Sequence, residues 1–100
     1  MVYRIDLRDG VLEIGFGPPA RNNVIVKSVK ARLDEMNQSG ELRGGAIIKI
    51  NGPSSLPVIA AIVYAVANRY EAVAVFDPKV GQYVVAISHG TTHQVGDLID

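Results

Sequence analysis

The dipeptide Asp9-Gly10 constrains this chain more than any other feature, because it sets the register of a β-hairpin. A type I′ turn needs two residues that tolerate positive φ angles, and Asp-Gly provides them. A two-residue loop pairs residues 3–7 with residues 12–16 and places all their apolar side chains on one face. These side chains are Tyr3, Ile5, Leu7, Leu12, Ile14 and Phe16.

The outer face of this predicted hairpin carries charges. The register sets Asp6 opposite Glu13, with Arg4 and Arg8 on the diagonals. A close pair of carboxylates is one way to bind a metal or share a proton. The alternative, which we favour, is a solvated surface on which the two arginines neutralise the acids.

Two further segments have helical periodicity. The first runs from about residue 22 to residue 36, and the second from about 56 to 69. Ser54 or Ser55 can cap the second helix, and Pro57 is tolerated in a first turn. The apolar residues of the first are spaced so that they share one face. They are Ile25, Val29, Leu33 and Met36.

The second predicted helix has no charged residue between Leu56 and Ala67. A helix that is apolar on all sides must be covered on more than one of them. A sheet covers one side, and the first helix or another subunit must cover the rest. We therefore expect a homodimer.

The remaining apolar segments predict strands at 46–50 and on both sides of residues 78–81, followed by a short C-terminal piece. The resulting order is ββαβαββ in a single domain, residues 1–100, because 100 residues suit one core. We predict an α+β fold with a mostly antiparallel sheet and two helices, ferredoxin-like in its layers. The strand order stays open.

The composition restricts the partners of this chain. Ten basic and ten acidic residues balance, whereas duplex DNA binding normally needs a basic excess. The first ten residues carry charges, and prolines interrupt the longest uncharged stretch, which argues against a signal peptide and a membrane span. The absence of cysteine fits a reducing environment. We expect a cytoplasmic protein that binds neither duplex DNA nor a membrane.

The segment Asn-Gly-Pro-Ser-Ser, residues 51–55, joins a predicted strand to the N-terminus of the second helix. Free N–H groups and the helix dipole favour anions at such a position. The segment lacks a Walker lysine and the spacing of a dinucleotide-binding motif. It is either an anion site that uses Gly52, Ser54 and Ser55 or only a capped loop.

Polar side chains also stand at the ends of the hairpin predicted for residues 73–89, VAVFDPKVGQYVVAISH. Asp77 either binds a ligand or hydrogen-bonds the turn that it opens, and Lys79 lies in that turn. His89 is a candidate general acid or base. At roughly 3.3 Å per residue, Asp77 and His89 lie about 20 Å apart and on opposite faces. A site that uses both must form between subunits, unless a β-bulge changes the register.

The segments NGPSSLP, AVAVFDPKVGQYVVAISH and VGDLID, with a long apolar helix after the first, resemble the small CRISPR-associated ring nucleases of type III systems, the Csx-three type. The likeness runs from about residue 45 to residue 99, with a looser match before it. It implies a dimeric α+β hydrolase that cleaves cyclic tetra-adenylate, an antiviral second messenger, with manganese. In that family the ring lies between two dimers, which implies a composite site and a higher assembly on the ligand.

Carried over by motif, the resemblance implies that Asp77 is catalytic and binds the metal, that Lys79 and Ser88 contact the ligand, and that His89 is catalytic. The family's second helix usually presents histidines, the later one nine residues before the Asp. This chain has Asn68 there. An Asn side chain can offer an oxygen to a metal but cannot act as an imidazole base.

Three interpretations remain open. The chain cleaves cyclic oligoadenylate with Asp77 and manganese, and Asn68 is a weakened catalytic position. Alternatively, it only binds this RNA messenger, as a sensor or sequestering domain. The third possibility is a structural module of a larger assembly. Members of the family also occur fused to larger C-terminal domains, so this chain is a candidate part of a longer protein.

Overall fold

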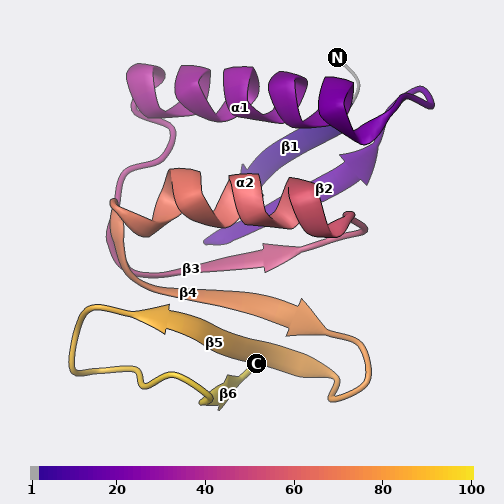
Figure 1. Ribbon diagram of the computed structural model, residues 1–100. Coiled ribbons are helices and arrows are strands. Elements are labelled where there is room, and N and C mark those ends of the chain that lie inside the picture. The colour runs from indigo at the N-terminus through magenta and orange to yellow at the C-terminus, as the bar shows by residue number, and fades with distance from the viewer. Residues whose placement is uncertain (1–2) are drawn as a thin grey trace.

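The computed structural model describes residues 3–100, apart from the side chains of Tyr3 and Phe16. The predicted order of elements is confirmed, and the C-terminal piece adds a short sixth strand (Figure 1). The strands are β1 (Tyr3–Arg8), β2 (Val11–Phe16), β3 (Gly45–Asn51), β4 (Tyr70–Asp77), β5 (Gln82–Ser88) and β6 (Leu98–Ile99). The helices are α1 (Asn22–Ser39) and α2 (Leu56–Ala67).

The six strands form one sheet in which their order follows the chain, from β1 to β6. The β2–β3 and β3–β4 pairs are parallel, and the other three pairs are antiparallel, so the sheet is mostly antiparallel as predicted. Crossovers between parallel strands are almost always right-handed, so two successive ones place their helices on one face. Figure 1 shows α1 and α2 together in front of the sheet, which is the layering that the fold shares with the ferredoxin-like class.

The N-terminal hairpin has the predicted register. Leu7 pairs with Leu12, and Ile5 pairs with Ile14. Asp9 and Gly10 both have positive φ angles, 50° and 77°, as a type I′ turn requires. Tyr3 and Phe16 are also paired, but the direction of their side chains lies outside the described part of the structure.

The core lies between the helices and the sheet. Helix α1 runs three residues further than predicted, to Ser39, and is capped by Gly40, which has a left-handed φ of 84°. Its first turn contains the β-branched run 24–26, yet two of these residues pack against the core, and tertiary packing outweighs weak helix propensity. The fully buried helix residues are Val29, Leu33 and Met36 of α1 and Val58, Ile62 and Val66 of α2.

The outer face of the N-terminal hairpin carries an open hollow lined in part by its four charged side chains, which are Arg4, Asp6, Arg8 and Glu13. Asp6 lies opposite Glu13, but no ion pair joins either acid to Arg4 or Arg8 in residues 3–100. The guanidinium group of Arg4 lies over Gly15 instead. Exposed ion pairs add little stability, so nothing fixes these long side chains beside the acids.

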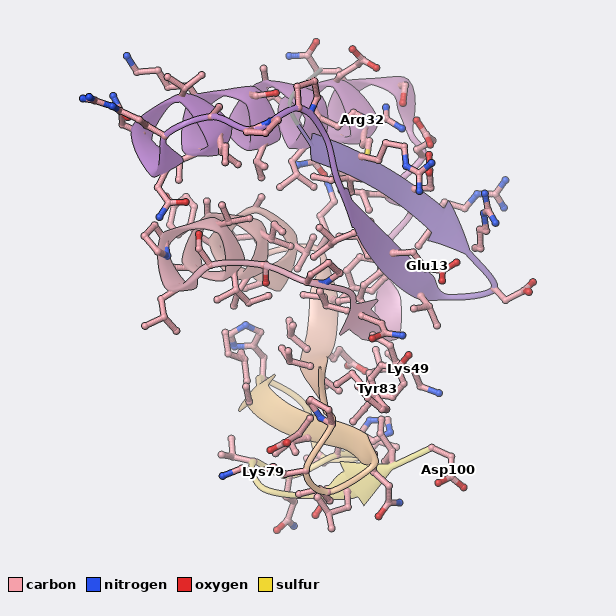
Figure 2. The ribbon with its side chains drawn as sticks, turned by 90° about the vertical axis from the view of Figure 1, so that its right-hand side faces the viewer. Glu13, Arg32, Lys49, Lys79, Tyr83 and Asp100 are labelled. Carbon is pink, nitrogen blue, oxygen red and sulfur yellow. The ribbon has the colours of Figure 1, made fainter. Side chains whose placement is uncertain are left out.

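The face of the sheet opposite the helices holds the C-terminus in place. Figure 2 shows Lys49 and Tyr83 on this side, with Asp100 below them. The ammonium group of Lys49 lies 5.3 Å from the centre of the Tyr83 ring and donates a hydrogen bond to the carbonyl of Asp100. Gln82 donates to a carboxylate oxygen of Asp100 at 3.1 Å. These contacts fix the two-residue strand β6 against β5.

Arg32 of α1 covers part of the free edge of β1. Its guanidinium group donates two hydrogen bonds to the carbonyl of Ile5, at 3.1 and 3.3 Å. It also contacts Glu35 at 3.0 Å and Glu41 at 3.4 Å. Only 15% of the Arg32 side chain is exposed. Edge strands left open are prone to pair with other chains, and this contact protects one of the edge carbonyls.

We expect Arg32→Ala to lower the free energy of unfolding by about 1–3 kcal/mol, because it removes charge-assisted bonds to a part-buried carbonyl. Urea unfolding followed by circular dichroism measures this change. Lys30→Ala is the control: its exposed salt bridge with Asp34 (2.7 Å) should leave the midpoint nearly unchanged. Equal midpoints for the two variants would mean that the Ile5 contact does not stabilise the fold.

Candidate functional site

The residues predicted to form a site lie in two groups at opposite ends of the sheet. Strands β3 and β4 are parallel, with Ile50 opposite Val75, so the residues that follow them reach the same edge. We call the first group the carboxyl edge: Gly52, Ser54, Ser55, Asp77 and Lys79. The second group, the far end, consists of Asn68, Ser88 and His89, which follow α2 and β5.

Gly52 fixes the loop at the carboxyl edge. Its φ is +128°, which favours glycine, and its backbone lies against β2. A Cβ atom at this position would lie 2.1 Å from the carbonyl oxygen of Ile14. Glycine is therefore required here by the packing of the loop, whether or not a ligand binds.

Ser55 stands at the N-cap of α2, as predicted, but its side chain does not cap the helix. The hydroxyl group donates instead to Oδ1 of Asn22 at 2.9 Å, which ties the start of α2 to the start of α1. Ser54 is half-buried beside it. The first turns of both helices lack acidic residues. N–H groups in the first turn of a helix have no intrahelical partner, and here no serine side chain satisfies them.

Asp77 hydrogen-bonds the turn that it opens, which was one of its two predicted roles. Its Oδ1 atom accepts the backbone N–H of Lys79 at 2.9 Å, and its carbonyl accepts the N–H of Gly81 at 2.8 Å. The Lys79 side chain is exposed and extends from the turn (Figure 2). An open hollow of about 300 Å³ adjoins Asp77; it is lined by Val75, Phe76, Asp77, Pro78, Val84 and Ala86.

The prediction that His89 lies on the opposite face from Asp77 is wrong, because β5 contains a bulge. Ala74 pairs with Val85, but Val73 pairs with Ile87, so β5 carries one extra residue. The extra residue reverses the alternation of side chains beyond it. Beyond the bulge Ser88 pairs with Ala72, so the His89 side chain lies on the face of the sheet that holds Asp77 and reaches the carbonyl of Ala67 in α2. The six residue steps from Glu71 to Asp77 still separate the two ends by about 20 Å.

His89 and Ser88 both have structural partners at the far end. Nε2 of His89 lies 3.1 Å from the carbonyl oxygen of Ala67, the last residue of α2. A ring N–H in this position satisfies one of the free carbonyls at the helix C-terminus. The hydroxyl group of Ser88 lies 2.5 Å from the carbonyl of His93 and 3.3 Å from that of Gly90, so it holds the loop after β5.

Asn68 is exposed at the C-cap of α2 and lies near His89 rather than near Asp77. An open hollow of about 390 Å³ contains both, together with Ala67, Arg69, Tyr70 and Glu71. Arg69 and Glu71 were not among the predicted site residues. Their position at the junction of a helix and a strand was the available signal, because charged side chains there share one end of the sheet.

The fit of a manganese ion depends on how many ligand side chains lie around Asp77. Among residues 3–100, no three histidine, aspartate or glutamate side chains lie where they could together hold a metal ion. Manganese prefers oxygen and imidazole ligands, and the described residues of one chain bring no two further side chains of this kind to Asp77.

The comparisons with known proteins give no assignment: no family model, no curated protein and no solved structure matches this chain. No helix in the described part of the chain is both long and apolar enough to cross a membrane.

Proposed function

We propose that this protein is a CRISPR-associated ring nuclease that binds cyclic tetra-adenylate at the carboxyl edge. One observation carries the proposal: the Asp77-Pro78-Lys79 turn and the uncapped N-terminus of α2 follow two adjacent parallel strands. Ligands of sheets with parallel strands bind beyond the carboxyl ends of those strands. First-turn N–H groups and an exposed lysine favour a phosphate-bearing ligand at that place.

We propose further that cleavage needs a second copy of the chain. His89 lies beside Glu71, which is six positions before Asp77 on β4. Asn68 follows the C-terminus of α2, whereas the N-terminus of α2 lies at the carboxyl edge. A phosphodiester group can touch only one of these ends within one chain. A site that combines Asp77 with the far end therefore takes them from different copies. Manganese is part of the same proposal, since its remaining ligands must also come from another copy.

The alternative is a protein that binds the messenger without cleaving it, as a sensor or sequestering domain in the cytoplasm. Two observations favour it. Asn68 replaces the histidine expected at this position, and Asp77 already accepts a hydrogen bond from its own turn. Incubation with labelled cyclic tetra-adenylate, with and without manganese, separates the two functions. Binding without hydrolysis would select the alternative.

We expect calorimetry to detect binding that weakens as salt is added. Lys79→Ala should weaken it by roughly 1–3 kcal/mol, or about 5–150-fold in Kd, because a charge-assisted phosphate contact is lost. Arg43→Ala is a matched control, since it removes one exposed positive charge at the other end of the sheet. No heat and no thermal stabilisation by excess ligand would exclude both candidate functions.

A further inference from the structure

The strand β6 forms one edge of the sheet, and it is very short (Figure 1). Its two residues, Leu98 and Ile99, pair with Val84 and Tyr83, whereas each of the other strands has six to eight residues. Residues 94–98 are exposed, and Leu98 keeps 50% of its surface in contact with solvent. A short, exposed edge element opens at a lower free energy than the centre of a sheet.

The segment around β6 contacts the sheet in three ways, and the first is backbone pairing. The N–H of Val85 donates to the carbonyl of Asp97 at 2.9 Å, and the carbonyl of Val85 accepts the N–H of Gly96 at 2.8 Å. Gly96 has a φ of 94°, and a Cβ atom there would meet nothing within 4 Å, so this part of the turn is loosely packed. The backbone groups of β5 can pair with any extended segment that replaces this one.

The second contact is apolar. On the face of the sheet opposite the helices, Ile99 packs against a small cluster of buried side chains. The cluster consists of Ala72, Ala74 and Val85, and Ile47 and Tyr83 also pack against it. Ile99 itself is only half-buried. The edge of β5 therefore offers a place for one apolar side chain of medium size.

The third contact receives an acidic residue. Lys49 donates to the carbonyl of Asp100, and Gln82 donates to its carboxylate at 3.1 Å. The ammonium group of Lys49 lies 5.3 Å from the centre of the Tyr83 ring, which helps to hold it in place (Figure 2). No acidic side chain among residues 3–100 forms an ion pair with Lys49. Its positive charge is thus complementary to an acidic side chain at this position.

We propose that β6 is the internal occupant of a peptide-binding edge, which an extended segment of a partner protein enters by replacing it on β5. The segment needs an apolar residue followed directly by an acidic one, as in Ile99-Asp100. Addition of a strand to a sheet edge uses backbone bonds for affinity and side-chain pockets for specificity. Gln82 also pairs with Asp77, so the bound segment lies beside the turn at the carboxyl edge. The proposal does not depend on cyclic tetra-adenylate.

The covalent tether of β6 keeps this edge closed to weak ligands. A segment tethered by a short flexible linker competes at an effective concentration in the millimolar range. A free peptide of the same sequence therefore cannot displace β6 at micromolar concentrations. Ile99→Ser weakens the internal occupant, because it removes the apolar contact but leaves Lys49, Gln82 and the backbone of β5 unchanged.

Fluorescence anisotropy with a labelled peptide of sequence VGDLID, which repeats residues 95–100, measures binding at this edge. Ile99→Ser should bind the peptide at least tenfold more tightly than the unmodified protein. Adding Lys49→Met to this variant should weaken binding at least fivefold. Adding Lys27→Met, which removes an exposed lysine of α1, should not. With all variants folded by circular dichroism, a peptide that does not bind Ile99→Ser, or that ignores Lys49→Met, would overturn the proposal.

Hydrogen exchange tests the opening of β6 in the unmodified protein. The N–H of Val85 should exchange at least tenfold faster than the N–H groups of β4 that bond to β3. Its rate should change little in low urea, because the opening exposes little surface. Exchange of Val85 only through global unfolding would contradict a replaceable β6. A dimer in sedimentation that the free peptide dissociates would make a second copy the occupant, and the partner protein would then be the wrong choice.

Discussion

Gly52→Ala is expected to lower the free energy of unfolding by about 3–5 kcal/mol, the largest stability change that we predict for one methyl group. Two costs add at this position. The φ of +128° is unfavourable for any residue with a Cβ atom, and the new methyl group would meet the Ile14 carbonyl at 2.1 Å. The loop must move away from β2 to relieve the contact. Urea unfolding monitored by circular dichroism measures the loss.

Gly81→Ala is the control for this prediction. Gly81 also has a positive φ, +75°, but a Cβ atom there would have no neighbour within 4 Å. Only the conformational cost applies, about 1–2 kcal/mol. The difference between the two variants therefore measures the contact between the residue 51–55 loop and β2. If both lose the same stability, the loop does not pack against Ile14 in solution.

Local chemistry was the predictable part of this fold. The Asp9-Gly10 turn and the alternation of apolar and polar side chains on both sides of it require the same strand register. The register and the buried face of the hairpin therefore follow from residues that are close in the sequence. The helices were predictable for a similar reason, because Val29, Leu33 and Met36 share one face. The sequential strand order was not, since it depends on contacts between segments far apart in the chain.

The errors around the candidate site have the same origin. In β5 both faces are apolar, so the residues Val84 to Ile87 give no signal of the extra residue that reverses the position of His89. Ser55 is a good capping residue, but its hydroxyl group bonds to Asn22, which lies 33 positions earlier in the chain. Sequence patterns identify which side chains can act, and distant segments decide which partners they meet.

Asp77→Asn is expected to abolish any hydrolysis of cyclic tetra-adenylate while leaving binding intact, and Asn68→His is expected to raise the rate. Asp77 is the only carboxylate among the predicted site residues, so its loss removes the anionic group that cleavage with manganese needs. An imidazole at position 68 can take a proton from the attacking oxygen, and general base catalysis typically contributes 10²–10⁴-fold. Labelled substrate, with and without manganese, measures both rates. Unchanged hydrolysis by Asp77→Asn, together with no effect of Asn68→His, would show that the site is wrongly assigned.

Mixing variants shows whether Asp77 and position 68 act across two copies. The double variant Asp77→Asn/Asn68→His should be inactive alone, because no copy carries Asp77. Mixed with the unmodified protein, it forms heterodimers in which the unmodified Asp77 faces a histidine from the partner subunit. The rate per unmodified chain should therefore rise above that of the unmodified protein alone. If both residues acted within one chain, the double variant would add no active site, and the rate would stay the same or fall. A rise would indicate a site shared between copies, which is the arrangement proposed from the positions of Asp77 at the end of β4 and Asn68 at the end of α2.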